Sequence, residues 1–349
     1  MRIIHFAPFA PCACGLYEAA RDMVIADRRA GHDAHLVDVG PTMRDGTHTD
    51  GKPGQIDSRG GTEIKTAEPG VAFFADMIVA HTGIPDNWIV QTQAPIVWIL
   101  HGRPAACFRP EQFGNGNSYT LMATLATWPR VKKMVTFWPY HVQFWNPIIP
   151  ADKLVCFPAP PIDETRFSPE GTTHDFADLG GKYNVMLSDA WREDVDIYEI
   201  THGAIEFAKS RKDVRFHFYG VQQPLRCWEF MFAELRRLGA LGEVWGQRPN
   251  IEEVYRAADA LLSPQRIVTR TVGEALSCGT PVIAAYGCEK ATYQINPAEP
   301  VSIKAQLGAM IQNVEDNRES VKNRARESAK DFSLAEYSKN MNRVYESIL

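Results

Sequence analysis

Along the whole chain, short runs of β-branched and aromatic residues alternate with longer segments whose apolar residues recur at helical spacing. Strands that alternate with helices form parallel sheets with crossover helices, so this pattern predicts an α/β fold. The strands predicted in the first half are Ile3–Ala7, His35–Val39, Met77–Ala80, Ile96–Leu100, Met134–Trp138 and Leu154–Phe157. Those predicted in the second half are Val185–Ser188, Val214–Tyr219, Val244–Trp245, Ala260–Ser263 and Pro281–Ala285.

The helical segments between the strands carry stop signals of their own. Ala19, Met23 and Ala26 recur at helical spacing after the first strand, and Gly31 ends that segment. Further helices are predicted at Ile197–Ser210, Glu252–Ala258 and Leu334–Leu349. The segment Pro41–Thr62 is rich in Gly, Asp, Thr and Ser, and it predicts a long exposed loop or an irregular excursion.

A proline-rich stretch divides the chain, whose 349 residues exceed one ordinary domain. Prolines concentrate between Phe157 and Gly171, where they stop both helix and sheet and stiffen the backbone. We therefore predict a doubly wound domain at residues 1–160, a linker at 161–180 and a second doubly wound domain at 181–332. Because such domains bind ligands at the carboxyl ends of their strands, the two are expected to face each other across a cleft.

Charge and hydropathy narrow the possible partners. The formal net charge of −5, with scattered Lys and Arg, does not indicate charge-driven binding of nucleic acid, although a local basic groove stays open. The apolar run Ile96–Leu100 is far shorter than the roughly 20 residues that a membrane span needs. The first strand begins at Arg2 and leaves no secretion leader, so we expect a cytoplasmic location.

The cysteines are odd in number, seven, which suits a reducing compartment. Cys156 and Cys278 lie in or beside apolar segments, where a thiol usually acts as a small buried hydrophobe. Cys12 and Cys14 are not spaced as Cys-x-x-Cys, and no second pair follows at zinc-ligand distance. We therefore expect no metal site.

The segment Ala257–Ala285 carries the most informative pattern. It predicts a helix end, a buried strand, a loop, a short helix, a glycine stop and another buried strand. A helix that begins near Arg270 and Thr271 directs its N–H groups and the positive end of its dipole toward the cleft, where a phosphate is expected to bind. One turn later, Glu274 is expected to accept hydrogen bonds from a ribose diol. The alternative is a helix cap with a solvated or ion-paired glutamate.

Several motifs, taken in chain order, resemble those of a known family. Pro11–Glu18 forms a glycine-containing loop after the first strand, and Pro161–Pro169 has the spacing Asp-x-x-x-Phe-x-Pro. Residues 274–284 read Glu-Ala-Leu-Ser-Cys-Gly-Thr-Pro-Val-Ile-Ala and follow a strand that begins Ala-Ala-Asp. With a final helix, these motifs resemble the family 4 glycosyltransferases of GT-B fold.

The resemblance implies two Rossmann-like doubly wound domains that face across a cleft, with the helix at 333–349 returning to the first domain. It implies a nucleotide-sugar donor, such as a UDP-sugar, on the second domain, an acceptor on the first, and transfer without an obligatory metal or other cofactor. The donor-binding residues that it implies are Gly15, Arg192, Arg270, Thr271 and Glu274. Arg192 is expected to pair with the diphosphate, and the alternative is a surface ion pair with Glu193 or Asp194.

One position departs from the family pattern. Glu274 matches the second glutamate of the family's Glu-x7-Glu motif, and the first glutamate falls on Arg266. The family's first glutamate is expected to contact the transferred sugar, and a cation does not accept the same hydrogen bonds. We therefore expect Arg266 to be a catalytic-site residue whose presence leaves the sugar and the retaining or inverting outcome open.

Histidines and aromatic residues follow the strands of the first domain. His81 and His101 come directly after two predicted strands, and His101 is the candidate to orient an acceptor hydroxyl or to relay its proton. Trp138 and His141 lie in an aromatic segment that would stack on an acceptor. The alternatives are structural histidines and an aromatic core beneath a helix.

Other enzyme classes lack their motifs in this sequence: no Gly-x-Ser-x-Gly elbow, no Walker loop and no Gly-x-Gly-x-x-Gly fingerprint after the first strand. We expect a hexosyl- or pentosyltransferase acting on a hydroxyl of a saccharide, a lipid-linked intermediate, a small metabolite or a hydroxymethylated base in phage-type DNA. The acidic net charge gives the DNA acceptor no support. The alternatives are a GT-B-like binding protein without turnover and a sugar-nucleotide epimerase of the same architecture.

Overall fold

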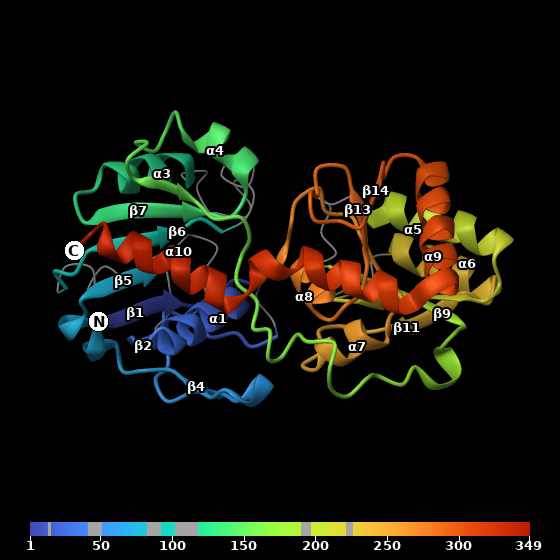
Figure 1. Ribbon diagram of the computed structural model, residues 1–349, viewed down its shortest axis with the longest axis horizontal. Helices are drawn as coiled ribbons and strands as arrows, with labels where there is room; N and C mark the ends of the chain where they lie inside the picture. The colour runs from blue at the N-terminus through green and yellow to red at the C-terminus, as the bar shows by residue number, and fades with distance from the viewer. Residues whose placement is uncertain (13–14, 41–50, 82–91, 102–117, 190–196, 221–225) are drawn as a thin grey trace. The chain divides into compact units, whose positions relative to one another are not determined.

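The computed structural model describes residues 1–12, 15–40, 51–81, 92–101, 118–189, 197–220 and 226–349. The chain forms two compact units (Figure 1). The first unit comprises Met1–Asp163 together with Asp331–Leu349, and the second comprises Glu164–Lys330. Each unit is built around a parallel six-stranded sheet, which confirms the predicted α/β class.

The sheet of the first unit has the strand order β2-β1-β5-β6-β7-β8, with every pair parallel. A parallel bridge between Leu36 and Thr66 brings the chain after β4 alongside β2, so the full order is that of a doubly wound nucleotide-binding fold. The strands are β1 (Arg2–Ala7), β2 (Asp33–Asp38), β5 (Met77–Ala80), β6 (Ile96–Ile99), β7 (Val131–Thr136) and β8 (Leu154–Cys156). All six were predicted, although β7 starts earlier than expected because its exposed lysines hide the pattern.

The described helices of the first unit are α1 (Gly15–Arg29), α3 (Ser118–Thr127), α4 (Pro139–Trp145) and α10 (Leu334–Glu346). Helices α1 and α10 pack together, and α1 also packs on β1 and β2 (Figure 1). Gly31 has a φ of 87°, which suits a glycine just beyond a helix end. Within the predicted loop Pro41–Thr62, the described part contains a strand of a small antiparallel hairpin, β3 (Ile56–Asp57) with β4 (Ile64–Lys65). Among the described residues of this unit, short 3-10 turns lie at Arg59–Gly61, Pro69–Phe74 and Lys330–Phe332, the last of which begins in the second unit.

The sheet of the second unit has the order β11-β10-β9-β12-β13-β14, again with parallel neighbours. Numbered along the unit, this is the order 3-2-1-4-5-6 of a doubly wound fold. Successive strands are added toward one edge of the sheet from β9 to β11 and toward the other edge from β12 to β14, so the strand order reverses between β9 and β12. The strands are β9 (Tyr183–Ser188), β10 (Val214–Tyr219), β11 (Leu241–Val244), β12 (Ala260–Ser263), β13 (Val282–Ala285) and β14 (Tyr293–Ile295). Strand β14 was not predicted.

Strand β11 lies earlier than the predicted Val244–Trp245 because a glycine interrupts its apolar pattern. A Cβ atom on Gly242 would lie 2.4 Å from Nδ1 of His217, so only glycine fits beside that buried ring. The helices of this unit are α5 (Ile197–Ser210), α6 (Arg226–Arg237), α7 (Ile251–Ala257), α8 (Arg270–Ser277) and α9 (Pro300–Ser328), with a 3-10 turn at Ala177–Leu179. Helix α9 is kinked at Asn317, which has non-helical backbone angles.

A buried group of charges fixes the segment that joins the first unit to the second. Arg21 of α1 is fully buried, and its guanidinium contacts three carboxylates, those of Asp22 at 3.1 Å, Asp57 at 3.3 Å and Asp163 at 3.5 Å. We call these four residues the Arg21 cluster. The side chain of Asp22 also accepts the backbone N–H of Asp163 at 3.0 Å. The aspartate of the Asp-x-x-x-Phe-x-Pro segment is therefore tied to α1.

Two cysteine predictions have different outcomes. Cys278 is buried, as expected for a small apolar side chain. Cys156 is exposed, so the prediction of a buried thiol is wrong there. It is the last residue of β8, which lies at the edge of its sheet, so no further strand covers it.

Candidate active site

In the second unit, the predicted donor-binding helix begins where expected. Strand β12 ends at Ser263, and α8 begins at Arg270 after a short loop. The N-cap residue is Thr269, whose backbone is extended and whose side chain makes no capping hydrogen bond. The first N–H groups of a helix have no partner within the helix, and they carry the positive end of its dipole. The start of α8 therefore offers backbone donors to an anion at the carboxyl edge of this sheet.

Glu274 is held inside the unit and not directed at solvent. Its Oε1 lies 2.7 Å from Nε of Arg270, one turn earlier on α8, and its Oε2 accepts the hydroxyl of Tyr255 at 3.4 Å. Burial raises the pKa of Tyr255 well above its ordinary value, and the charge on Glu274 adds to this effect. The ion pair named as the alternative to ribose binding is thus present.

The other residues expected near the donor lie around the same helix start. Thr271 is partly exposed, and its Oγ1 is 2.8 Å from Oγ1 of Thr269. Arg266 is exposed in the loop between β12 and α8. Beside it, Gln265 donates from Nε2 to Oδ2 of Asp189, which follows β9, at 2.7 Å. This bond links the segments that follow β12 and β9, the two strands between which the strand order reverses. Ligands of doubly wound sheets usually bind at that place.

Two more residues, Arg192 and Gly15, were predicted to bind the donor. Arg192 lies outside the described residues. Gly15 belongs to the first unit, where it is the exposed first residue of α1, and a Cβ atom there would meet nothing within 4 Å. Glu18, one turn further along α1, accepts the N–H of Cys12 at 3.0 Å and contacts Arg59 at 2.7 Å. The loop that precedes α1 is therefore held to this helix by a carboxylate.

The two predicted histidines of the first unit lie side by side. Nδ1 of His81 is 3.0 Å from Nε2 of His101, with the rings stacked. Burial lowers the pKa of His101 to about 4, and burial with the neighbouring rings lowers that of His81 well below its ordinary value. Both imidazoles are therefore neutral at neutral pH.

Two residues that the sequence did not predict extend this pair. Nε2 of His81 is 3.1 Å from Nδ1 of His5, and Nε2 of His5 is 2.9 Å from Oδ2 of Asp27. His5 lies in β1, and its signal in the sequence is a histidine within an otherwise apolar strand. The signal for Asp27 is a carboxylate among the buried residues of α1.

Trp138 and His141, predicted on the acceptor side, contact each other. Their ring centroids are 4.8 Å apart, and Trp138 also packs edge-on against Phe137. Trp138 is 8% exposed and His141 is 1% exposed. Such burial favours the alternative of an aromatic core beneath α4, and stacking on an acceptor stays a prediction.

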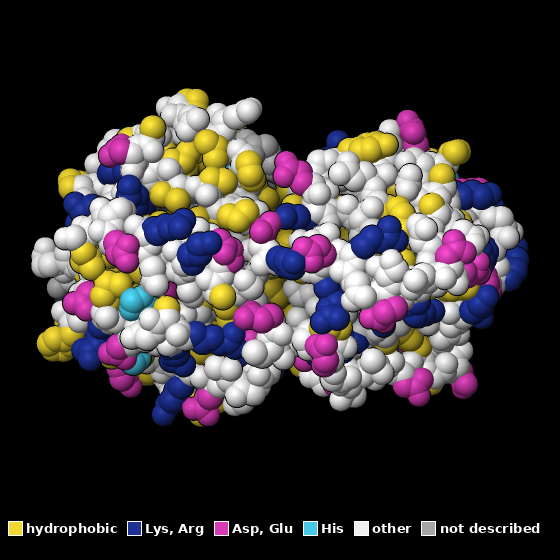
Figure 2. All heavy atoms as spheres, in the orientation of Figure 1, with side chains coloured by type: hydrophobic (Ala, Val, Ile, Leu, Met, Phe, Trp, Pro, Cys, Tyr) yellow, Lys and Arg dark blue, Asp and Glu magenta, His cyan; other side chains and the backbone are white. Residues whose placement is uncertain are grey.

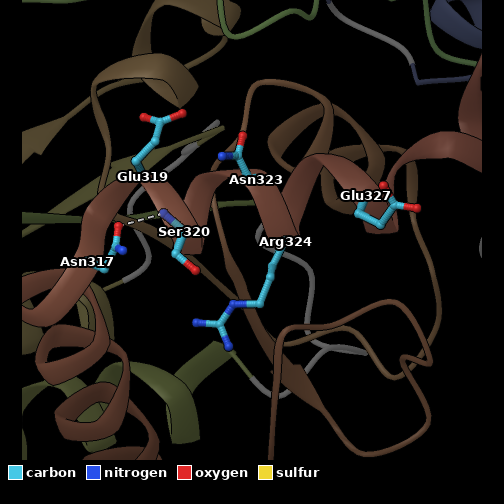
Figure 3. A pocket seen from close by; sticks show the side chains of 6 residues that line it. All are labelled: Asn317, Glu319, Ser320, Asn323, Arg324 and Glu327. Carbon is cyan, nitrogen blue, oxygen red and sulfur yellow. Dashed lines mark hydrogen bonds between the residues drawn. The ribbon is translucent and has the colours of Figure 1, made fainter.

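A separate hollow runs along α9, from the kink at Asn317 toward the C-terminal end of the helix. Its lining comes from this helix alone: Asn317, Glu319, Ser320, Asn323, Arg324 and Glu327 (Figure 3). The labelled side chains point in different directions, and the hydrogen bond drawn there joins the backbone N–H of Ser320 to Oδ1 of Asn317 at 2.9 Å. Because these polar groups do not converge on a common point, the hollow does not resemble a catalytic site.

Other kinds of site find no support in the described part of the chain. No three His, Cys, Asp or Glu side chains there are grouped to hold a metal ion. No helix among the described residues is long and apolar enough to cross a membrane. On the face drawn in Figure 2, Lys and Arg lie interspersed with Asp and Glu, and the described residues form no broad basic area there.

Comparison with known sequences finds a family that matches part of the chain. Residues 194–313 match the family described as Glycosyl transferases group 1. The match begins before α5 and ends within α9, so it includes α8 with Arg270 and Glu274. No curated protein sequence matches the chain significantly.

Solved structures extend the likeness to the whole chain. A glycosyltransferase from Rickettsia africae superposes with a TM-score of 0.70 at 16% identity, over 99% of this chain and 98% of that one. Sucrose-phosphate synthase from Thermosynechococcus elongatus gives a TM-score of 0.67 at 13% identity, over 100% and 99%. The pneumococcal O-GlcNAc transferase in complex with UDP and GlcNAc gives 0.65 at 11% identity, again over 100% and 99%. Residues 194–313 thus match the group 1 glycosyl transferases, and the chain as a whole has the GT-B fold that its sequence motifs predict.

Proposed function

We propose that this protein transfers a glycosyl group from a nucleotide-sugar donor to an acceptor hydroxyl. The observation that carries the proposal is the start of α8: a family-matched segment places a helix N-terminus, Arg270 and Glu274 together at the carboxyl edge of a doubly wound sheet. A diphosphate needs such donors, because departure of the nucleotide leaves negative charge that the site must stabilise.

Each residue at this helix start has a distinct proposed role. The backbone N–H groups and the guanidinium of Arg270 bind the diphosphate, and the ion pair with Glu274 holds this guanidinium at the helix start. Glu274 accepts hydrogen bonds from the ribose, in exchange for the long contact with Tyr255. Because cationic and dipolar groups stabilise the leaving group, we propose transfer without a metal or other cofactor.

The donor is proposed to be a UDP-sugar. The pneumococcal transferase of the same fold was solved with UDP and GlcNAc, and an E. coli protein described as trehalose-6-phosphate, with a TM-score of 0.65, was solved with UDP-2-fluoro glucose. Arg266 replaces a sugar-contacting glutamate in the family motif, so the choice of sugar is proposed to depend on it. Gly15 and Arg192 are proposed to take part in binding the same donor. We also propose a cytoplasmic location.

The acceptor is proposed to bind the first unit near His101, at the carboxyl edge of its sheet. Trp138 and His141 are proposed to lie on the acceptor side of the site, although both are largely buried. A saccharide, a lipid-linked intermediate or a small metabolite fits the net charge of −5 and the mixed charge of the face drawn in Figure 2 better than DNA does.

The test is a thermal-shift panel followed by turnover. UDP, ADP, GDP, UDP-glucose, UDP-GlcNAc, ADP-glucose and GDP-mannose are each added to the protein, because a ligand that binds only the folded state raises the melting temperature. The nucleotide sugar that gives the largest shift is then incubated alone, and release of the nucleoside diphosphate is measured. We expect a shift with UDP and UDP-sugars and a slow release by hydrolysis.

Three results would contradict the proposal in different ways. No shift with any compound would remove the nucleotide-sugar donor. A shift without release, with or without mixed sugar acceptors, would favour a binding protein that has no turnover. Conversion to an isomeric nucleotide sugar with no free diphosphate would identify an epimerase.

A further inference from the structure

The first unit contains a row of hydrogen-bonded imidazoles that leads from the edge of its sheet into its interior. The row consists of His101, His81 and His5 and ends at Asp27, and we call these four residues the histidine chain. The successive nitrogen–nitrogen distances are 3.0 and 3.1 Å, and the last nitrogen–oxygen distance is 2.9 Å. All three distances are those of ordinary hydrogen bonds.

The register of three neighbouring strands produces this row. His5 of β1 pairs with Val79 of β5, and His81 lies two residues beyond Val79 on the same face. Because Ala80 pairs with Trp98 of β6, His81 is level with Ile99, and His101 again lies two residues further on. Each ring is thus displaced by two residues from the last, which brings diagonal neighbours within contact distance.

The position of the row is that of a ligand site. The order of strands across this sheet reverses between β1 and β5. Ligands of doubly wound sheets bind at the carboxyl ends of the strands beside such a reversal. His101 is partly exposed at that edge, whereas His81 is 2% exposed, and His5 and Asp27 are fully buried.

The carboxylate fixes the direction of every hydrogen bond in the row. An ionised carboxylate only accepts, so Nε2 of His5 carries the proton and its Nδ1 is an acceptor. Nε2 of His81 must then donate to His5, and Nε2 of His101 must donate to Nδ1 of His81. The remaining nitrogen, Nδ1 of His101, is left with a lone pair.

The surroundings of Asp27 favour a positive charge near it. Its Oδ2 also accepts the hydroxyl of Tyr345 at 2.9 Å, and its Oδ1 has no hydrogen-bond partner among the described residues. Helix α1 contributes Asp27 and α10 contributes Tyr345 and Tyr337, whose pKa values are raised well above normal by burial and by the charge on Asp27. Both phenols are therefore neutral, and they do not compensate the carboxylate.

We infer that the histidine chain is a proton relay, in which His101 takes the proton of the acceptor hydroxyl and the positive charge is passed to His5 beside Asp27. The inference rests on the proposed function, since glycosyl transfer to a hydroxyl releases one proton. The acceptor O–H bond breaks as the new glycosidic bond forms, and the diphosphate leaves with its electron pair. The proton bonds to Nδ1 of His101, the proton on its Nε2 moves to Nδ1 of His81, and the proton on Nε2 of His81 moves to Nδ1 of His5.

The relay explains how His101 acts as a base despite its environment. Burial lowers the pKa of His101 to about 4, which makes this ring by itself a weak acceptor of protons at neutral pH. Transfer along the chain places the charge where a buried carboxylate stabilises it. His101 is then the catalytic residue, and His81, His5 and Asp27 are positioning residues that act through it.

The first test needs no substrate. Nitrogen-15 NMR of histidine-labelled protein reports which ring nitrogen carries each proton, and the signals are assigned with His5→Asn, His81→Asn and His101→Asn. At neutral pH we expect the Nε2–H form for all three rings, and on acidification His5 is expected to gain a proton before the other two. An Nδ1–H form at His81 or His101, or protonation of His101 first, would overturn the relay whatever the protein's activity.

The second test uses hydrolysis of UDP-glucose or UDP-GlcNAc, since water must also lose a proton. Asp27→Asn keeps the shape and the hydrogen-bonding capacity of the side chain and removes its charge. We expect kcat at neutral pH to fall at least tenfold, the donor KM to change less than twofold, and the acidic limb of the pH profile to move to lower pH because the protonated chain loses its counter-charge. An unchanged kcat and an unchanged limb in folded protein would refute the relay.

A buried histidine elsewhere provides the matched control. His217 lies in β10 of the second unit, is fully buried, and is bonded to Oδ1 of Asn184 at 3.0 Å. His217→Asn is expected to lower the melting temperature without moving the pH limb. If no nucleotide sugar of the panel is turned over, with or without sugar acceptors, the proposed function fails, and the tautomer measurement still decides whether the histidine chain is ordered for a relay.

Discussion

Replacing Arg21 by methionine is expected to destabilise the first unit strongly. Its guanidinium is fully buried against three carboxylates in the Arg21 cluster, and it also donates to the backbone carbonyl of Arg59. Methionine fills a similar volume but leaves the carboxylates without that cation. Removal of one partner from a buried ion pair costs about 3–5 kcal/mol, because the remaining charge stays buried.

Neighbouring arginines set where in that range the value should lie. Arg59 contacts Asp57 at 2.7 Å, and Arg29 contacts Asp163 at 3.2 Å, so two of the three carboxylates keep a second cation. We therefore expect a loss of about 3 kcal/mol in the free energy of unfolding of the first unit. For a unit of this size, the loss corresponds to a fall in melting temperature of about 6–12 °C.

The assay is urea unfolding followed by hydrogen exchange of peptides from β1 and α1, which report the first unit alone. Arg2→Met is the matched control, because Arg2 forms a 2.8 Å pair with Asp33 in which both side chains are about half exposed. An exposed pair contributes less than about 1 kcal/mol. A loss below 1 kcal/mol for Arg21→Met, or equal losses for the two variants, would refute the reasoning from burial.

Four further outcomes are expected. Glu274→Ala should raise the donor KM about tenfold or more, as loss of a charged hydrogen-bond acceptor implies, and an unchanged KM would exclude ribose binding by this residue. Arg266→Glu should alter the preference among UDP-sugars and leave the melting temperature nearly unchanged, because the side chain is exposed; an identical donor profile would count against its role. Gly15→Ala should fold as well as the parent, since a Cβ atom meets nothing within 4 Å, and should raise the donor KM only if the donor approaches that backbone. Burial acts to raise the pKa of Asp57, but hydrogen bonds from Arg59 outweigh it and hold that pKa below its usual value. Urea midpoints of the first unit should therefore fall as the pH drops below about 4. Asp57→Asn should flatten this dependence on pH.

The strands were predictable because each is a short apolar run, and their buried faces leave few alternatives. The boundaries Met77–Ala80, Val214–Tyr219 and Ala260–Ser263 are those of β5, β10 and β12. Strand prediction failed where a strand is not uniformly apolar, as at Gly242 in β11. The burial of Cys156 was wrongly predicted because β8 lies at the edge of its sheet. Sequence periodicity indicates whether a side chain suits a buried face, but it does not indicate whether the strand lies at the centre or at the edge of its sheet.

The donor side was more predictable than the histidine chain for a related reason. Arg270 and Glu274 are one turn apart on one helix, so their spacing alone predicts that they can touch. The chain from His101 to Asp27 instead depends on three strands and on α1, and Tyr345 reaches the same carboxylate from a position 318 residues later in the sequence. No local pattern contains that information.

The two sheets share a doubly wound order, yet they hold different polar groups where the chain reverses. In the second unit the bond between Gln265 and Asp189 lies beside a helix start suited to an anion. In the first unit the same topological place holds His5 and His81, buried and aligned toward a carboxylate. An apolar residue at position 5 would suit the burial pattern of β1 equally well, so packing does not account for the histidine. The relay explains why a histidine stands in this buried strand, because His5 must carry a positive charge beside Asp27.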